Sequence, residues 1–144
     1  MLKEYSTISL KEIDSVSILE LNRPEKLNAF NMQMLDDMLD AIDHINKNDN
    51  IKSLVITGSG RAFCAGADLS SGEKTFDKSF NTNEQYKSDF MRDAGGILNL
   101  KIYNSLKPVI AACNGDAVGI GATMQLPADV RIASKKSRFG FVFA

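Results

Sequence analysis

The stretch "SGRAFCAGADLSSG" (Ser59–Gly72) directly follows the apolar run "IKSLVITG" (Ile51–Gly58). A run that is apolar at nearly every position is typical of a strand covered on both faces of a parallel sheet. The stretch after it consists mainly of small residues with one cysteine and Asp68, and we expect it to form an exposed turn. Small side chains leave the backbone N–H groups of such a turn open to a ligand.

A second turn of the same kind follows the apolar segment "KPVIAACNG" (Lys107–Gly115). We expect "AVGIGATMQL" (Ala117–Leu126) to form a short helix that Pro127 ends. The turn Asn114–Gly121 then leads into a helix N-terminus, where unpaired N–H groups favour negative charge. The sequence therefore offers open amides in two places: residues 65–67 in the first turn and residues 119–122 in the second.

The N-terminal part of the chain predicts a hairpin followed by a helix. Ser6–Glu12 and Val16–Asn22 alternate polar and apolar residues around a turn. Asn31 is a good N-cap for the next segment, in which apolar residues recur at helical spacing. These apolar residues are Met34, Leu35, Met38, Ala41, Ile42 and Ile45, and we place Asp36, Asp37, Asp40 and Asp43 on the other, polar face.

The middle of the chain predicts a loop and a second helix. Ser70–Asn83 is polar and has no period, so we expect a mobile surface loop. Asn83–Ser105 has a helical pattern through Tyr86, Phe90, Met91, Ile97, Leu98 and Ile102, weakened by the pair Gly95 and Gly96. Ala128–Ser134 is a further strand candidate.

Strands that alternate with helices after an opening hairpin indicate an α/β fold with a largely parallel sheet. A chain of 144 residues can bury one ordinary core, so we expect a single domain over residues 1–144. Ligands of such sheets bind outside the carboxyl ends of the strands. Both turns, Gly58–Leu69 and Asn114–Gly121, are expected at that edge.

The composition excludes several classes of partner and site. The chain has 17 basic and 18 acidic residues, which gives no reason to expect a nucleic-acid or membrane partner. The N-terminus does not resemble a signal peptide, so we expect a cytoplasmic protein or one of an organelle matrix. Cys64 and Cys113 belong to no CxxC or Cys/His cluster, and we expect neither a metal site nor a disulfide.

The glycines of the two turns do not form a nucleotide-binding motif. A dinucleotide fingerprint needs a small residue three positions after its second glycine, but Phe63 follows Gly60 and Met124 follows Gly121. Two amides that converge on one oxygen would instead form an oxyanion hole, where losing one donor costs about 3 kcal/mol of transition-state stabilisation. The alternative is that the small residues of both turns only serve packing.

Three segments resemble successive motifs of the crotonase superfamily, the enoyl-CoA hydratases and isomerases. They are "NRPEKLNAF", "SGRAFCAGADL" and "KPVIAACNGDAVGIGATMQLPADVRIAS", and they follow one another in the family's order across Leu21–Phe141. The resemblance implies a spiral core of ββα repeats, usually assembled as homotrimers or hexamers, that binds acyl-CoA thioesters. It implies no separate cofactor, because coenzyme A is part of the substrate.

The resemblance also assigns site residues. It places the two oxyanion-hole donors on the backbone N–H groups of Ala67 and Ile120; the second position is often Gly in the family, and the run "AVGI" is similar to that of Δ3,Δ2-enoyl-CoA isomerases. The other positions that it assigns to substrate binding are Lys26, Ala65, Asp68, Leu69, Gly119, Gly121 and Thr123. Lys26 would approach a CoA phosphate, and a solvated surface lysine is the alternative.

The catalytic acid or base is the part of the family pattern that the sequence does not supply. Enoyl-CoA hydratases carry two Glu residues at positions that correspond to Thr123 and Phe143. An isomerase needs only one carboxylate, which in similar proteins lies beyond a segment like "RFGFVFA". We therefore expect a Glu or Asp within about twenty residues after Ala144, as a loop of the site would require. The sequence looks cut at its C-terminus, with the helical part of the family fold absent.

Other acidic residues are weaker candidates for the base. We expect Asp68 to fix its loop by accepting hydrogen bonds from nearby N–H groups. Asp116 lies beside the second turn and is a remote candidate, and Asp129 is expected to anchor a strand. Glu73 and Asp77 fall in the predicted mobile loop, where solvated charge is the alternative to a role in binding.

The histidine and the two cysteines are not expected to be catalytic. His44, the single histidine, falls on the polar helix face, and without a nearby histidine the cysteines are expected to serve packing.

The sequence leaves three functions open. The first is an enzyme of the enoyl-CoA hydratase/isomerase family, with Δ3 to Δ2 enoyl-CoA isomerisation favoured over hydration. The second is a non-catalytic or truncated acyl-CoA-binding relative. The third is an α/β domain without affinity for CoA.

Overall fold

The computed structural model describes residues 3–76 and 93–143. Its strands are β1 (Ile8–Ile13), β2 (Val16–Leu21), β3 (Ser53–Gly58), β4 (Ala62–Cys64), β5 (Val109–Cys113), β6 (Asp116–Val118), β7 (Val130–Ala133) and β8 (Phe139–Gly140). Its helices are α1 (Met32–Lys47), α2 (Ala94–Tyr103) and α3 (Ile120–Thr123), with 3₁₀ segments η1 (Pro24–Lys26) and η2 (Leu69–Phe76).

The strands form two sheets that the chain visits in turn. One sheet has the order β1-β2-β3-β5-β7, and the other has the order β4-β6-β8. Every pairing is parallel except that of β1 with β2. The units β3-β4-α2 and β5-β6-α3 repeat the same path, which confirms the predicted α/β fold with a spiral of ββα repeats.

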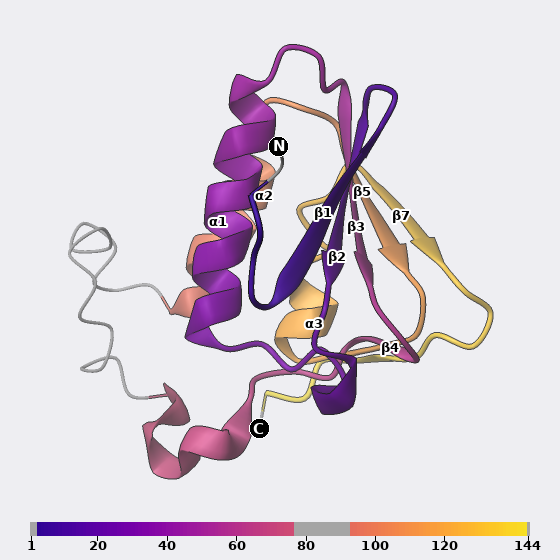
Figure 1. The fold of residues 1–144 in the computed structure, drawn as a ribbon. Helices are drawn as coiled ribbons and strands as arrows, with labels where there is room; N and C mark the ends of the chain where they lie inside the picture. Colours follow the sequence, from indigo (N-terminus) through magenta and orange to yellow (C-terminus); the bar gives the residue numbers. More distant parts are fainter. Residues whose placement is uncertain (1–2, 77–92, 144) are drawn as a thin grey trace.

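Helix α1 forms where its capping residue and apolar spacing predict it. The side chain of Asn31 accepts a hydrogen bond from the Met34 N–H at 2.8 Å. All six predicted apolar residues of the helix are buried. In Figure 1 α1 lies beside the fan of strands, with α2 on the same side of the larger sheet. The buried side chains of α1 therefore fill the core between helix and sheet.

One residue of the polar helix face was assigned wrongly. Asp37 is only 7% exposed, and its carboxylate accepts hydrogen bonds from the N–H and the hydroxyl of Thr7 at 2.9 and 2.7 Å. Gln33 donates a further hydrogen bond to it at 2.8 Å. The charge is tolerated because these donors replace water, and the contact ties the segment before β1 to the helix.

Helix α2 is shorter than the pattern predicted, and one of its glycines has a packing role. It begins at Ala94, and the Asp93 side chain accepts a hydrogen bond from Gly96 N–H at 2.7 Å. A side chain on Gly95 would have its Cβ 3.1 Å from Cδ1 of Ile120. Gly95 thus lets α2 approach α3, and the part of the predicted helix at residues 83–92 lies outside the described residues.

Three expectations about the strands and the first turn were wrong. Ala62–Cys64 is a buried strand rather than part of an exposed turn, because this short segment pairs with β6 inside the second sheet. Strand β3 buries only alternate residues, so it is not equally covered on its two faces. The helix predicted from Ala117 begins only at Ile120, since residues 116–118 form β6 between β4 and β8.

The predicted loop contains a 3₁₀ segment where the structure describes it. Residues 69–76 form the 3₁₀ segment η2, with a kink at Gly72, where φ is 59°. Glu73 lies in this segment, and Asp77 lies outside the described residues together with the rest of the predicted loop.

Apolar side chains are exposed beside β7 and β8. All four residues of β7 are exposed, and Phe141, Val142 and Phe143 are exposed by 57–68%. An open pocket of about 300 Å³ lies here, lined by residues that include Leu126 and Phe139. Among the described residues, no helix is long and apolar enough to cross a membrane.

The cap of α1 gives a test of the helix assignment. We expect Asn31→Ala to lower the free energy of unfolding by about 1 kcal/mol, because the Met34 N–H loses its acceptor. Asn31→Ser is the matched control, since a serine oxygen can accept the same hydrogen bond. Urea denaturation measures both variants. Equal losses for Ala and Ser would contradict the role of the cap.

Candidate functional site

The two predicted donors lie at equivalent positions beyond one pair of neighbouring strands. Strands β4 and β6 are parallel, and Cys64 is paired with Ala117. Ala67 and Ile120 each lie three residues beyond that pair. The parallel register therefore brings the two strand ends, and the corners that follow them, to the same edge of the small sheet.

Glycines, which have no side chain, allow the two corners to touch. A Cβ atom on Gly121 would lie 2.1 Å from the carbonyl oxygen of Cys64, well inside contact distance. A Cβ on Gly119 would lie 3.8 Å from Cα of Gly66, and one on Gly66 would lie 3.3 Å from the carbonyl oxygen of Val118. The backbone of residues 64–66 thus packs directly against the backbone of residues 118–121.

At the first corner, the amide of Ala67 is left open while its neighbours are bonded. The N–H groups of Ala65 and Asp68 donate to the carbonyls of Leu27 and Phe30 at 3.0 and 2.7 Å. The Gly66 carbonyl accepts from Phe30 N–H at 2.8 Å. In a trans peptide the C=O and N–H point in opposite directions, so the Ala67 N–H points away from Phe30. It has no partner within residues 3–76 and 93–143.

The second corner also leaves amides open. The Gly119 N–H donates to the Gly140 carbonyl at 2.8 Å, so this amide is not available to a ligand. Its own carbonyl accepts from the N–H groups of Ala122 and Thr123 at 3.0 and 3.1 Å. The N–H groups of Ile120 and Gly121 begin α3, and no acceptor for them occurs in the described part of the chain. Gly119 and Gly121 therefore shape the corner, and Gly121 adds a further open donor.

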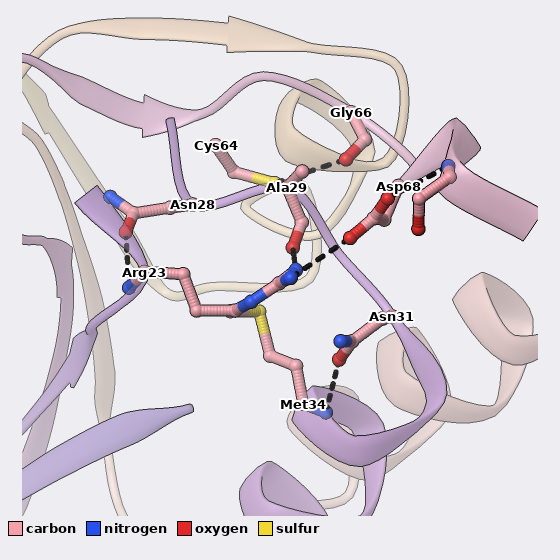
Figure 2. Close-up of polar contacts among 9 residues, drawn as sticks. Arg23, Asn28, Ala29, Asn31, Met34, Cys64, Gly66 and Asp68 are labelled. Carbon is pink, nitrogen blue, oxygen red and sulfur yellow. Dashed lines mark hydrogen bonds and ion pairs between the residues drawn. The ribbon is translucent and has the colours of Figure 1, made fainter. Parts of the chain in front are cut away.

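An ion pair between Arg23 and Asp68 fixes the first corner to the connector after β2 (Figure 2). The Arg23 guanidinium donates through Nη1 to the Ala29 carbonyl at 2.6 Å and through Nη2 to Oδ2 of Asp68 at 2.9 Å. The two charged side chains are only 15% and 12% exposed. The other carboxylate oxygen of Asp68 accepts from Ser70 N–H at 2.9 Å. Asp68 thus anchors its loop, as the sequence predicted.

Two asparagines hold the segment before β4. The side-chain amide of Asn28 donates to the carbonyls of Ser59 and Ala62 at 2.8 and 3.0 Å. That of Asn114 donates to the carbonyls of Gly60 and Ala62 at 3.0 and 3.2 Å. Asn28 is fully buried, with a positive φ of 55°. Together they connect residues 59–62 to the connector after β2 and to the turn after β5.

The remaining predicted binding residues lie around the same two corners. Lys26 and Leu69 are exposed, on η1 and at the start of η2, and Ala65 is half-buried between them in the loop. Thr123 lies in α3, where its hydroxyl donates to the Ile120 carbonyl at 3.3 Å. The structure therefore brings the predicted residues to one edge of the small sheet, with Thr123 turned to its own helix.

Asp68 and Asp116, which the sequence analysis weighed as possible bases, are held as anions. The pKa of Asp68 is lowered to about 2. Hydrogen bonds from Ser70 are the largest cause, and the Arg23 guanidinium is the next. Arg138 donates to both carboxylate oxygens of Asp116 and lowers its pKa in the same way. A carboxylate with a lowered pKa is a weak proton acceptor, so neither suits the role of general base.

The other candidates have structural contacts. The Asp129 carboxylate accepts from Val109 N–H at 2.7 Å and anchors the start of β5. His44 is exposed and lies 3.4 Å from a carboxylate oxygen of Glu12. Cys64 and Cys113 are buried, and burial raises the pKa of each thiol to about 11. Within the described residues, no group of three His, Cys, Asp or Glu side chains could hold a metal ion.

Sequence reasoning missed the residues that support the corners. Arg23, Asn28 and Asn114 were read only as parts of motifs, and Gly95 only as a weak point of a helix. A signal existed for Asn28, because asparagine is enriched among residues with positive φ. Nothing in the local sequence indicated that Arg23 reaches Asp68, 45 residues further along the chain.

Comparisons with known proteins agree with this geometry. The chain is 40% identical over 132 residues to "Enoyl-CoA hydratase AKT3-2" of Alternaria alternata, covering 92% of this chain and 42% of that protein. It is 36% identical to the "1,2-epoxyphenylacetyl-CoA isomerase" of Escherichia coli, covering 90% and 48%. An enoyl-CoA hydratase structure from Mycobacterium avium subsp. paratuberculosis superposes with a TM-score of 0.79 at 25% identity, covering 99% and 52%.

The chain spans about half or less of the length of these relatives. The family model described as "Enoyl-CoA hydratase/isomerase" matches residues 11–144, which include both corners and every element that supports them. The chain therefore belongs to the enoyl-CoA hydratase/isomerase family of the crotonase superfamily.

Proposed function

We propose that the chain binds acyl-CoA thioesters and stabilises the enolate that forms when an α-proton leaves. The oxyanion hole consists of the N–H groups of Ala67 and Ile120. The observation that carries the proposal is a pair of amides, three residues beyond the paired strand positions Cys64 and Ala117, that have no hydrogen-bond partner among the described residues. Such preorganised donors favour the charge that develops on the thioester oxygen in the transition state.

The coenzyme A portion would lie along the first corner. Ala65 and Leu69 offer small and apolar surface there, and Lys26 is exposed on the adjacent connector. Asp68 contributes by holding the loop, because Arg23 and Ser70 occupy both of its carboxylate oxygens. We propose that the adenine and pantetheine contact this loop and that a CoA phosphate contacts Lys26.

We propose Δ3 to Δ2 enoyl-CoA isomerisation as the reaction. Thr123 stands where hydratases carry a catalytic Glu, and its hydroxyl is bonded to its own helix. Asp68 and Asp116 are held in ion pairs. Isomerisation needs a single carboxylate, which takes a proton from one carbon and returns it two carbons away. That carboxylate would lie outside the described residues. We propose separately that the active form is a homotrimer or hexamer.

Hydration is the second candidate, and the names of relatives favour it. The Alternaria protein and a 37% identical protein of Clostridium acetobutylicum are both named as enoyl-CoA hydratases. Hydration would need a group other than Thr123 to activate water. Incubation with 2-enoyl-CoA and with 3-enoyl-CoA substrates separates the two reactions by their products.

The proposed oxyanion hole is tested with a conjugated ligand such as cinnamoyl-CoA. Hydrogen bonds to its carbonyl pull electron density toward the oxygen, so we expect its absorption to move to longer wavelength on binding. Free CoA and butyryl-CoA, measured by calorimetry, separate nucleotide binding from recognition of the thioester. Binding of cinnamoyl-CoA without a spectral shift would refute the proposed oxyanion hole. Absence of any binding would refute the proposed function.

Gly121→Ala tests whether the two corners must touch. The new Cβ would overlap the Cys64 carbonyl, a backbone atom that cannot turn aside. We expect a loss of about 1–3 kcal/mol in unfolding free energy and loss of the spectral shift. Gly140→Ala is the control, because its Cβ would meet only ordinary contacts at 3.7 Å or more. A full spectral shift in Gly121→Ala would refute this requirement.

The pH dependence of stability tests whether Asp68 is held as an anion. Its pKa of about 2 lies below the ordinary value of about 3.9 for aspartate, so its contribution is present above about pH 4 and is lost as the pH falls toward 2. We expect the stability gap between the natural chain and Asp68→Asn to shrink over that range. Urea denaturation at several pH values measures the gap. A constant gap would contradict the assignment.

A further inference from the structure

We propose that Arg23 orients and polarises the Ala67 amide through two peptide groups, and so acts as a positioning residue for the oxyanion hole. This inference rests on the proposed function, because it assigns a purpose to a hydrogen-bond chain that ends at the proposed donor. Arg23 itself touches no part of the thioester. Its effect would be transmitted by the backbone of the connector after β2.

The chain of hydrogen bonds is continuous from the guanidinium to the open amide. Arg23 Nη1 donates to the Ala29 carbonyl at 2.6 Å, and the N–H of that same peptide group, on Phe30, donates to the Gly66 carbonyl at 2.8 Å. The N–H of the Gly66 peptide group is the open amide of Ala67. Each peptide group is planar, so fixing its carbonyl also fixes the direction of its N–H.

The charge at the start of this chain has an electrostatic consequence. A cation that bonds to a peptide carbonyl polarises the peptide group and makes its N–H a stronger donor. Hydrogen bonds in a row strengthen one another by about 10–30% per bond. Arg23 is 15% exposed, so water screens its charge less than that of a surface arginine. The Ala67 N–H is therefore the end of a polarised series.

Asp68, the residue after Ala67, holds both the Arg23 guanidinium and the backbone on the C-terminal side of the open amide. Its carboxylate accepts from Nη2 of Arg23, which holds the guanidinium plane, and its N–H donates to the Phe30 carbonyl at 2.7 Å. Residues 66 and 68 are thus both fixed to Phe30, and Ala67 between them is held with its N–H outward. The guanidinium reaches the Ala29 carbonyl and the Asp68 carboxylate with two different nitrogens held in one plane. The ammonium group of a lysine has only one nitrogen and cannot reproduce this geometry.

Two substitutions at Arg23 each remove one of the two properties that the proposal requires, the planar fork or the positive charge. Arg23→Lys keeps the charge but loses the planar fork, and Arg23→Gln keeps a planar N–H donor but loses the charge. We expect both to reduce the spectral shift of bound cinnamoyl-CoA and to weaken the preference for enoyl-CoA over free CoA by roughly fivefold, the effect of one ordinary hydrogen bond. Affinity for free CoA, which lacks a thioester oxygen, should fall by a smaller factor than affinity for enoyl-CoA, because Arg23 also helps Asp68 to hold the loop proposed to bind CoA.

A matched control exists in the same chain. Arg138 also pairs with an aspartate, Asp116, but its side chain is 83% exposed, and within the described part of the chain it donates to no peptide carbonyl. Arg138→Lys and Arg138→Gln should leave the spectral shift unchanged. Circular dichroism and thermal melting establish that each compared variant is folded. A general loss of structure would lower the affinities for free CoA and for enoyl-CoA by the same factor.

The outcomes are distinguishable. Folded Arg23 variants that bind cinnamoyl-CoA with the same spectrum as the natural chain would overturn the inference and leave the proposed function intact. No spectral shift in the natural chain would refute the oxyanion hole, and the inference with it. Should the Arg23 variants not fold, the natural chain still decides by NMR, through the scalar coupling across the hydrogen bond from Phe30 N–H to the Gly66 carbonyl. That coupling should grow when cinnamoyl-CoA binds, and its absence or constancy would overturn the inference.

Discussion

The contact between the Gly121 backbone and the Cys64 carbonyl is the constraint on which the rest of the site depends. Any side chain at residue 121 would force the two corners apart, since its Cβ would lie 2.1 Å from a backbone oxygen. Strand pairing brings the corners to the same edge, and the missing side chain lets them meet. The larger sheet and its helices give these short strands a fixed platform, which a three-stranded sheet of such length would not have alone.

The connector after β2 has a local structure that would be unfavourable without its contacts. Leu27 and Asn28 both have positive φ, of 52° and 55°, which costs energy for residues other than glycine. The cost is offset because Asn28 is bonded on both ends of its amide, to the Arg23 N–H and to two carbonyls of the neighbouring loop. A strained but tightly bonded segment is a suitable support for a donor that must not move during a reaction.

Local patterns in the sequence predicted the elements, and contacts between distant residues decided the rest. The Asn31 cap and the apolar face of α1 follow from spacing within a few residues, and both were confirmed. Ala62–Cys64 and Ala117 were misassigned because their strand character comes from pairing with each other across the small sheet. Asp37 was misplaced for the same reason, since Thr7 supplies the donors that allow its burial. The family resemblance supplied the two proposed donor positions, but it did not indicate the Arg23–Asp68 ion pair next to the first of them.

The proposed oxyanion hole requires that two amides from separate corners bind one oxygen. The most direct measurement follows the backbone amide signals of Ala67 and Ile120 by NMR while acetyl-CoA, and separately free CoA, is added to the isotope-labelled chain. We expect both amide protons to move strongly downfield together when acetyl-CoA binds and to stay in place with free CoA. A shift of only one of the two, or the same small shift with both ligands, would contradict it.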